Sequence, residues 1–167
     1  MEEKTLLKAV LVFPVRRKQV LLARKVQKIG AGCLNGYGGG IEKGESALDA
    51  AIRELKIESR LETVAGDYEK VAEVHFHNQK SDGSFFTCDC DVFLVRKWRG
   101  TPQSTREMYD PQWFSIARLP VKEMMPADKD WVPLIFAGWK IVVHAWYGPF
   151  QKVLLQQTKV KYVTSFD

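Results

Sequence analysis

The chain has few cysteines, no long apolar run and no block of one charge. Its three cysteines cannot pair evenly, and Cys88 and Cys90 flank Asp89 without zinc-site partners at the usual spacing. We therefore expect reduced thiols on strands, and neither a disulfide framework nor a zinc centre. The longest apolar run, residues 9–15, is too short for a signal peptide or a membrane span. We expect a cytoplasmic protein with no membrane partner.

The composition is that of one ordinary globular domain. The chain has 167 residues, of which 46% are hydrophobic, and this suffices for a sizeable core without repeats or low-complexity tracts. We therefore expect a single domain over residues 1–167. The net charge of +5 suits a small anionic substrate, whereas dispersed aromatic residues argue against a nucleic-acid surface. Nothing in the sequence selects an oligomeric state.

The segment from Gly39 to Leu61 carries the most chemical information. The turn at its start is rich in glycines that leave backbone groups uncovered: Gly36, Gly38, Gly39 and Gly40. Ser46, followed by Asp49, forms a capping box that predicts a helix starting after Gly44. Apolar residues then recur at three- and four-residue spacing and predict one buried stripe: Leu48, Ala51, Ile52 and Leu55.

Carboxylates lie beside this stripe. At about 100° per residue, Glu54 and Glu58 fall one turn apart on one flank of the helix, close enough to coordinate one cluster of cations. Ile57 falls on the same flank. Mg²⁺ suits such a site because it accepts carboxylate oxygens and bridges to substrate phosphates, and Mn²⁺ is the alternative. A capped amphipathic helix with exposed glutamates is also common without any function.

The order of these residues resembles the Nudix box. The pattern runs through Gly39, Glu45, Arg53-Glu54-Leu55, Glu58 and Leu61. Ile57 stands where the first of two paired glutamates belongs, so we expect weaker cation binding and one fewer bound ion. Arg60 stands where the pattern has glycine, and a left-handed conformation there would cost about 1 to 2 kcal/mol.

The resemblance implies an α/β fold, the Nudix α/β/α sandwich with a mixed sheet, and a set of site residues. Metal ligands carried over from the family are the Gly38 carbonyl, Glu54, Glu58 and Glu107. Arg53 and Glu45 would hold the loop against the helix. The implied reaction is phosphoanhydride cleavage, in which metal-bound water attacks phosphorus.

A finer resemblance, to the MutT-type branch that hydrolyses oxidised purine nucleotides, covers nearly the whole chain. It rests on residues 30–39, Glu107-Met108, Trp113-Phe114 and residues 131–134. It implies a base pocket that contains Asn35, Phe76, Met125 and Asp128. Met125 replaces a stacking tryptophan and Ala127 replaces one of two base-reading aspartates, so we expect a retuned pocket. We expect Asp128 alone to be ionised and to accept hydrogen bonds only.

Two further clusters have a functional and a structural interpretation. Lys25, together with Arg24 and Lys28, precedes the glycine run and could face phosphates, although such a cluster is more often a solvated rim. Glu73, His75 and His77 alternate on one predicted strand. We favour a polar, solvated strand face there over a metal site, because no fourth ligand is visible nearby.

The remaining patterns predict strands and one more helix. Strands are expected at residues 6–13, 20–23, 69–77, 85–95, 112–114, 140–146 and 152–163, and a helix at residues 131–137. A turn at residues 81–84 would join the fourth strand to the third.

These observations predict Mg²⁺-dependent hydrolysis of a nucleoside triphosphate, with a purine or oxidised purine favoured, to nucleoside monophosphate and pyrophosphate. One alternative is a degenerate Nudix domain that binds a nucleotide without cleaving it, which Ile57 and Arg60 favour. The other is hydrolysis of a nucleoside diphosphate linked to another group, such as ADP-ribose.

Overall fold

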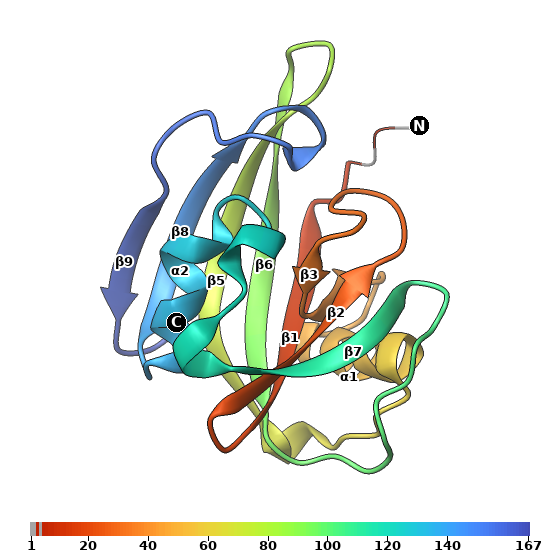
Figure 1. Ribbon diagram of the computed structural model, residues 1–167. Coiled ribbons are helices and arrows are strands. Elements are labelled where there is room, and N and C mark those ends of the chain that lie inside the picture. Colours follow the sequence, from red (N-terminus) through yellow and green to blue (C-terminus); the bar gives the residue numbers. More distant parts are fainter. Residues whose placement is uncertain (1–2, 4) are drawn as a thin grey trace.

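The computed structural model describes residue 3 and residues 5–167, and its centre is one mixed β-sheet (Figure 1). Within the described residues, nine strands belong to this sheet, in the order β3-β2-β1-β6-β5-β8-β9, with β4 paired to β1 and β7 paired to β2. The strands are β1 (Lys8–Arg16), β2 (Gln19–Lys25), β3 (Leu34–Asn35), β4 (Tyr37–Gly40), β5 (Tyr68–Gln79), β6 (Phe85–Val95), β7 (Met108–Ser115), β8 (Lys140–Tyr147) and β9 (Lys159–Val163). Two pairings, β1 with β6 and β5 with β8, are parallel, and the others are antiparallel.

Two helices, α1 (Ala47–Ser59) and α2 (Asp128–Phe136), cover the sheet. Successive residues of β1 point to opposite faces and therefore enter two different cores. Val10 and Val12 pack in the core that contains Leu55 of α1, whereas Phe13 packs in the core that contains Trp131 of α2. The predicted α/β/α sandwich with a mixed sheet is thus confirmed.

Most predicted elements are present, with shifted ends. The helix predicted from residue 131 begins at Asp128, and the strand predicted over residues 112–114 extends over Met108–Ser115. The last predicted strand, residues 152–163, is wrong in its first half, because the continuous strand that pairs with β8 begins only at Lys159 and ends at Val163. Before it, the chain makes a short 3-10 turn at Pro149–Gln151 and a single bridge between Tyr147 and Leu154. The predicted turn at residues 81–84 does join β5 to β6.

Two histidines on the polar face of β5 contact a histidine on β8. His75 stacks on His144, and His77 Nε2 lies 2.8 Å from His144 Nδ1. His75 Nδ1 also lies 2.6 Å from Asp89 Oδ1 on β6. This histidine cluster is partly exposed, in keeping with the preferred interpretation of a polar strand face.

None of the described helices has the length and apolar character needed to cross a membrane.

Two of the three cysteines, Cys88 and Cys90, lie on β6, and all three are free thiols. Cys33 is not on a strand, contrary to prediction, because it follows the turn that leads into β3.

Candidate active site

The helix that carries the carboxylates is capped at both ends by the residues that the sequence indicated. Ser46 Oγ accepts a hydrogen bond from the backbone N–H of Asp49 at 3.0 Å. At the other end, Arg60 adopts a left-handed conformation with φ 71°, and its N–H donates to the carbonyl of Lys56. The chain therefore uses a non-glycine residue where a glycine would adopt the same conformation without steric cost.

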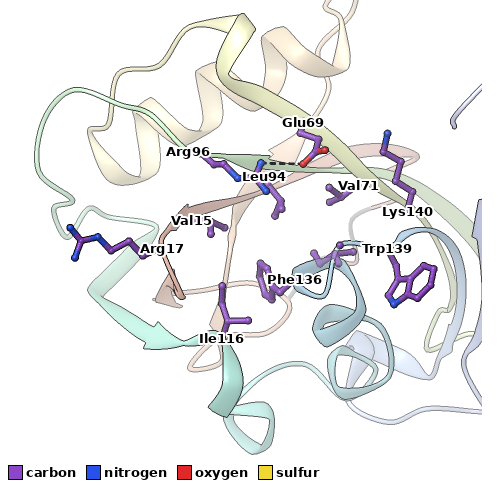
Figure 2. Close-up of a pocket in the computed structure, with 12 residues that line it drawn as sticks. Val15, Arg17, Glu69, Val71, Leu94, Arg96, Ile116, Phe136, Trp139 and Lys140 are labelled. Atoms are coloured by element: carbon purple, nitrogen blue, oxygen red, sulfur yellow. Dashed lines mark hydrogen bonds and ion pairs between the residues drawn. The ribbon is translucent and has the colours of Figure 1, made fainter. Parts of the chain in front are cut away.

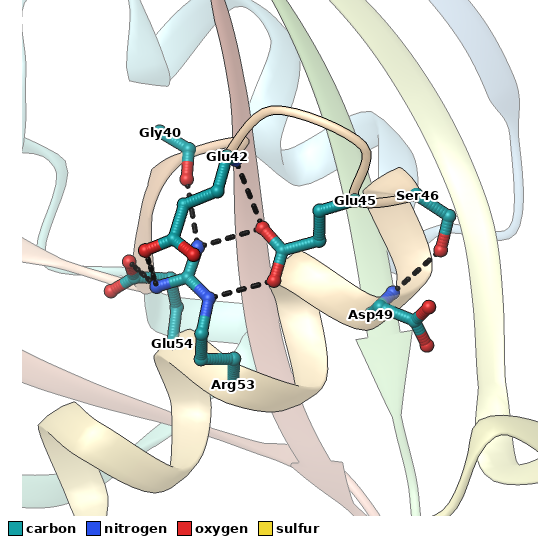
Figure 3. Close-up of polar contacts among 7 residues, drawn as sticks. All are labelled: Gly40, Glu42, Glu45, Ser46, Asp49, Arg53 and Glu54. Atoms are coloured by element: carbon teal, nitrogen blue, oxygen red, sulfur yellow. Dashed lines mark hydrogen bonds and ion pairs between the residues drawn. The ribbon is translucent and has the colours of Figure 1, made fainter.

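Arg53 fastens the glycine-rich loop to α1 (Figure 3). Its guanidinium donates to both carboxylate oxygens of Glu45, at 2.7 and 2.9 Å, and to the carbonyl of Gly40 at 3.0 Å. Nη1 donates to Glu54 Oε1 at 2.7 Å. Such bidentate pairing fixes both distance and orientation. The hydrogen bonds from Arg53 lower the pKa of Glu45 to about 2, so this pair stays charged at any physiological pH.

Three carboxylates converge next to this loop. Glu54, Glu58 and Glu107 each offer an oxygen, and these oxygens all lie within 4.8 Å of one another. It is the one such grouping of three or more potential ligands among the described residues. Glu107 precedes β7, so it reaches the cluster from a segment far from α1 in the sequence.

The glycines allow this close approach. A Cβ atom on Gly39 would lie 2.8 Å from the carboxylate carbon of Glu54, so a larger residue would displace the carboxylate. The N–H of Gly38 donates to Glu58 Oε1 at 2.8 Å. The structure thus uses the Gly38 amide to orient Glu58, and the ligand role of the Gly38 carbonyl stays a prediction.

The electrostatics of the cluster suit a hard cation. Glu58 is only 5% exposed, and burial, together with the neighbouring Glu107, raises its pKa to about 9. A buried carboxyl group beside two others holds its proton until a cation compensates the charge. The donor set is all oxygen, which is the set that Mg²⁺, Mn²⁺ and Ca²⁺ prefer. Ile57, on the same flank, is 44% exposed and adds no ligand.

A cavity of about 570 Å³ is lined by the three carboxylates and by residues of strands β1, β5 and β6. It brings together nine of the predicted site residues: Lys25, Asn35, Gly38, Glu54, Glu58, Phe76, Glu107, Met125 and Asp128. The other two, Arg53 and Glu45, are not among the lining residues and instead hold the loop against the helix (Figure 3).

The basic residues near the glycine run divide into two groups. Lys25 and Lys28 line the cavity, and burial lowers the pKa of the Lys25 ammonium while Glu58 raises it. Arg24 instead binds Glu123 at 2.7 Å and donates to the carbonyl of Gly32 at 3.1 Å. Lys25 and Lys28 are therefore the members of this cluster that could meet a phosphate.

The predicted base-pocket residues line the same cavity as the carboxylates. Asn35 Oδ1 accepts from the N–H of Gly36 at 2.8 Å, which fixes the orientation of the Asn35 amide. Asp128 is 5% exposed, and its carboxylate accepts from the N–H of Met125 at 3.1 Å. Burial raises the pKa of Asp128 to about 7. The expectation of a plainly ionised Asp128 was therefore wrong, because the α2 terminus that carries it is buried.

Some residues that line the cavity were not identified as site residues from the sequence, namely Asn78, Trp131, Tyr147, Phe150 and Gln151. Trp131 was noted only as part of the run at residues 131–134. Asn78 and Tyr147 lie near the ends of β5 and β8, and Phe150 and Gln151 lie in the turn after β8. Only the parallel pairing of these two strands, which places Asn78 opposite Tyr147, brings them together.

A smaller cavity of about 260 Å³ lies elsewhere, near the end of α2 (Figure 2). It is lined by apolar residues such as Val15 and Phe136, and Arg96 on its rim pairs with Glu69 at 3.1 Å. Arg17 points away from it in Figure 2. It contains none of the predicted site residues, so the larger cavity is the candidate active site.

Comparison with known proteins agrees with the box and with the fold. The family model of the NUDIX domain matches residues 5–135. The chain belongs to the Nudix family. This Nudix chain is 35% identical over 134 residues to an oxidized purine nucleoside triphosphate hydrolase of Mus musculus. The aligned residues make up 80% of this chain and 82% of the relative. A protein of the same name from Danio rerio is 35% identical over 125 residues, covering 75% and 76%. Among solved structures, a MutT protein from Bacillus halodurans superposes with a TM-score of 0.74 at 21% identity, over 93% of this chain and 97% of that one.

Proposed function

We propose that this Nudix chain is a metal-dependent hydrolase that cleaves nucleoside triphosphates to nucleoside monophosphate and pyrophosphate. One observation carries the proposal: the carboxylate cluster shares a single cavity with apolar side chains and with amide and carboxyl groups. A nucleotide has parts that match both kinds of lining, namely a phosphate chain and a flat base. The two relatives named as oxidized purine nucleoside triphosphate hydrolases support a purine substrate.

Glu54, Glu58 and Glu107 would hold Mg²⁺, which would supply charge neutralisation and an activated water when bound. The chain's own residues then position the substrate. Lys25 would bind a phosphate oxygen from the opposite wall, and Arg53 with Glu45 would keep the loop and the helix at a constant separation. Asn35 and Asp128 would orient the base. Since the substrate would be free nucleotide, we also propose a cytoplasmic location.

The activity can be tested by incubating the protein with a panel of nucleotides and Mg²⁺ or Mn²⁺ and resolving the products by ³¹P NMR. We expect nucleoside monophosphate and pyrophosphate, with purine triphosphates cleaved faster than pyrimidine triphosphates. Release of inorganic phosphate, or no cleavage of any triphosphate, would contradict the proposal. ADP-ribose belongs in the same panel.

A binding-only function is the second candidate, and the exposed Ile57 on the metal flank is the observation that favours it. The two candidates differ in one result. A binding-only domain would retain nucleotides in equilibrium binding measurements at every metal concentration and release no product.

A further inference from the structure

The turn between β8 and β9 contributes an aromatic ring and an amide to the cavity. It comprises Gly148 and the 3-10 segment Pro149–Gln151, and both Phe150 and Gln151 line the cavity. The turn is closed by hydrogen bonds from Gly148 N to Val153 O at 2.9 Å and from Gln151 N to Gly148 O at 3.0 Å. These bonds fix the backbone positions from which the Phe150 and Gln151 side chains extend.

Two consecutive non-glycine residues in this turn adopt the left-handed conformation. Phe150 has φ 57° and ψ 22°, and Gln151 has φ 55°. This conformation is sterically unfavourable for residues with a Cβ atom, and it persists where the surrounding structure enforces it, often at ligand sites. Glycine at either position would form the same turn without strain. The chain instead places a large aromatic residue and an amide there, beside a cavity.

The Gln151 side chain is joined to the base end of the cavity by a chain of hydrogen bonds. Its Nε2 donates to Asn78 Oδ1 at 2.8 Å, and Asn78 Nδ2 donates to the carbonyl of Phe76 at 3.0 Å. Asn78 is 6% exposed, so this amide pair is well ordered. Gln151 retains its Oε1 acceptor and its second Nε2 proton for another partner.

The neighbouring pocket wall combines apolar and aromatic side chains. Met125 offers an apolar surface without a flat ring, whereas Phe76 and Trp131 offer rings. The nearest ring to Phe76 in this wall, Tyr147, has its hydroxyl occupied by the N–H of Ala127 at 2.9 Å. Phe150 and Gln151 therefore add a further ring and an amide held by Asn78 to this wall.

We propose that Phe150 and Gln151 determine base specificity: Phe150 stacks on the base of the bound nucleotide, and Gln151, held by Asn78, reads its edge. This inference rests on the proposed nucleotide substrate and assigns the base recognition to a strained turn. Base stacking on an aromatic side chain tolerates any base, whereas an amide discriminates between edges. The two residues thus have separable effects.

Four variants test the assignment: Phe150→Ala, Phe150→Gly, Gln151→Leu and, as a matched control, Gln156→Ala. Gln156 is an exposed residue of the same connection and does not line the cavity. The substrates are dATP, dGTP, dCTP, dTTP and 8-oxo-dGTP, together with 2-deoxyribose 5-triphosphate, which has no base. Values of kcat and KM are measured for each substrate, and melting temperatures are measured for each variant.

We expect Phe150→Ala to raise KM roughly tenfold or more for every nucleotide with little change in kcat, and to leave the base-free triphosphate unaffected. Gln151→Leu should change the ratio of kcat/KM between dATP and dGTP by about tenfold, while stacking persists. Phe150→Gly should lose as much nucleotide affinity as Phe150→Ala but melt at a higher temperature, because glycine relieves the left-handed strain. The control should match the wild type.

Equal losses on the base-free triphosphate, or unchanged nucleotide kinetics in both Phe150 variants, would overturn the assignment. If the wild type cleaves no nucleotide, the same variants are titrated with dAMP, dGMP, dCMP and dTMP by isothermal calorimetry. Base-dependent binding that weakens in the Phe150 variants would then support the assignment while refuting hydrolysis. Binding that ignores both substitutions would refute the assignment itself.

Discussion

The backbone N–H of Gly38 donates a hydrogen bond to Glu58 Oε1 across 2.8 Å, which joins the glycine-rich strand β4 to the helix α1. This contact orients a carboxyl group that is almost fully buried and that lies within reach of Glu54 and Glu107. A carboxyl group in this position has two states. It is neutral without a cation, since its pKa is raised to about 9, and it ionises when a cation binds.

Glu58 should therefore be indispensable for activity and dispensable for folding. Glu58→Gln retains the hydrogen bond from Gly38 and resembles the neutral carboxyl group, so the metal-free protein should unfold at nearly the same denaturant concentration. Turnover with Mg²⁺ should fall roughly a hundredfold or more, because the substitution removes a charge that acts on the transition state. Steady-state kinetics and urea unfolding check both statements. Glu62→Gln, at an exposed glutamate just beyond α1, is the control. Survival of activity in Glu58→Gln would show that the metal site is elsewhere.

Ile57 offers the opposite test, a gain of metal affinity. By helical spacing Ile57 falls on the flank of α1 that carries Glu54 and Glu58. It is 44% exposed, so a glutamate there would meet little steric resistance. Ile57→Glu should lower the Mg²⁺ concentration that gives half-maximal activity, because an added carboxylate strengthens a site of hard ligands. Ile57→Gln, which has the same length without the charge, should leave this concentration unchanged. An unaltered Mg²⁺ dependence in a folded Ile57→Glu protein would mean that position 57 does not face the metal.

The parts of the site that could be predicted from the sequence are those with a local residue pattern. Glu54 and Glu58 were found from helical spacing alone, since residues four apart share one flank of any helix. Ser46 was found because helix starts have local residue preferences. Arg60 was found because it stands at the glycine position of the family pattern. Glu107 was placed only through resemblance to the family, because no local pattern connects it with a helix about fifty residues away.

Phe150 and Gln151 show where such prediction stops. Positive φ angles at non-glycine residues have no sequence signature, so the turn that contains these two residues was not predicted. Residues 152–158, which follow it, were assigned to a strand that begins only at Lys159. Burial of Asp128 was missed for a related reason. An aspartate at the first turn of a helix is usually solvated, and only the packing of α2 against β8 encloses this one.

Asp128 should make the protein less stable as the pH rises. Its pKa is raised from 3.8 to about 7 in the folded protein, so between about pH 4 and pH 7 the folded state binds more protons than the unfolded state. The free energy of unfolding therefore falls with rising pH across this window and levels off above pH 7. Asp128→Asn should remove this contribution: relative to the wild type, the variant should gain stability between pH 5 and pH 8. Urea unfolding of both proteins in EDTA measures the difference between their free energies of unfolding. Glu58 is the same in both proteins, so its contribution cancels in this difference. A pH-independent difference would indicate that Asp128 is ionised throughout.

The same carboxyl group leads to a prediction about base selection. With a pKa of about 7, Asp128 can donate or accept near neutral pH, but it has no carboxyl partner because position 127 is an alanine. A pocket with so few dedicated polar groups should separate 8-oxo-dGTP from dGTP only slightly, by about 10 to 200-fold at most. Ala127→Asp would supply a second carboxyl group, and two adjacent carboxyl groups share a proton, so one donates while the other accepts.

We therefore expect Ala127→Asp to widen the preference for 8-oxo-dGTP over dGTP, measured by competition of both substrates in one assay. Ala127→Asn is the matched control, because it has a similar size but cannot share a proton with Asp128. Since Ala127 is fully buried, melting temperatures are needed to establish that both variants fold. A strong preference for 8-oxo-dGTP in the wild type, or equal selectivity in the two folded variants, would show that residues 127 and 128 do not read the base together.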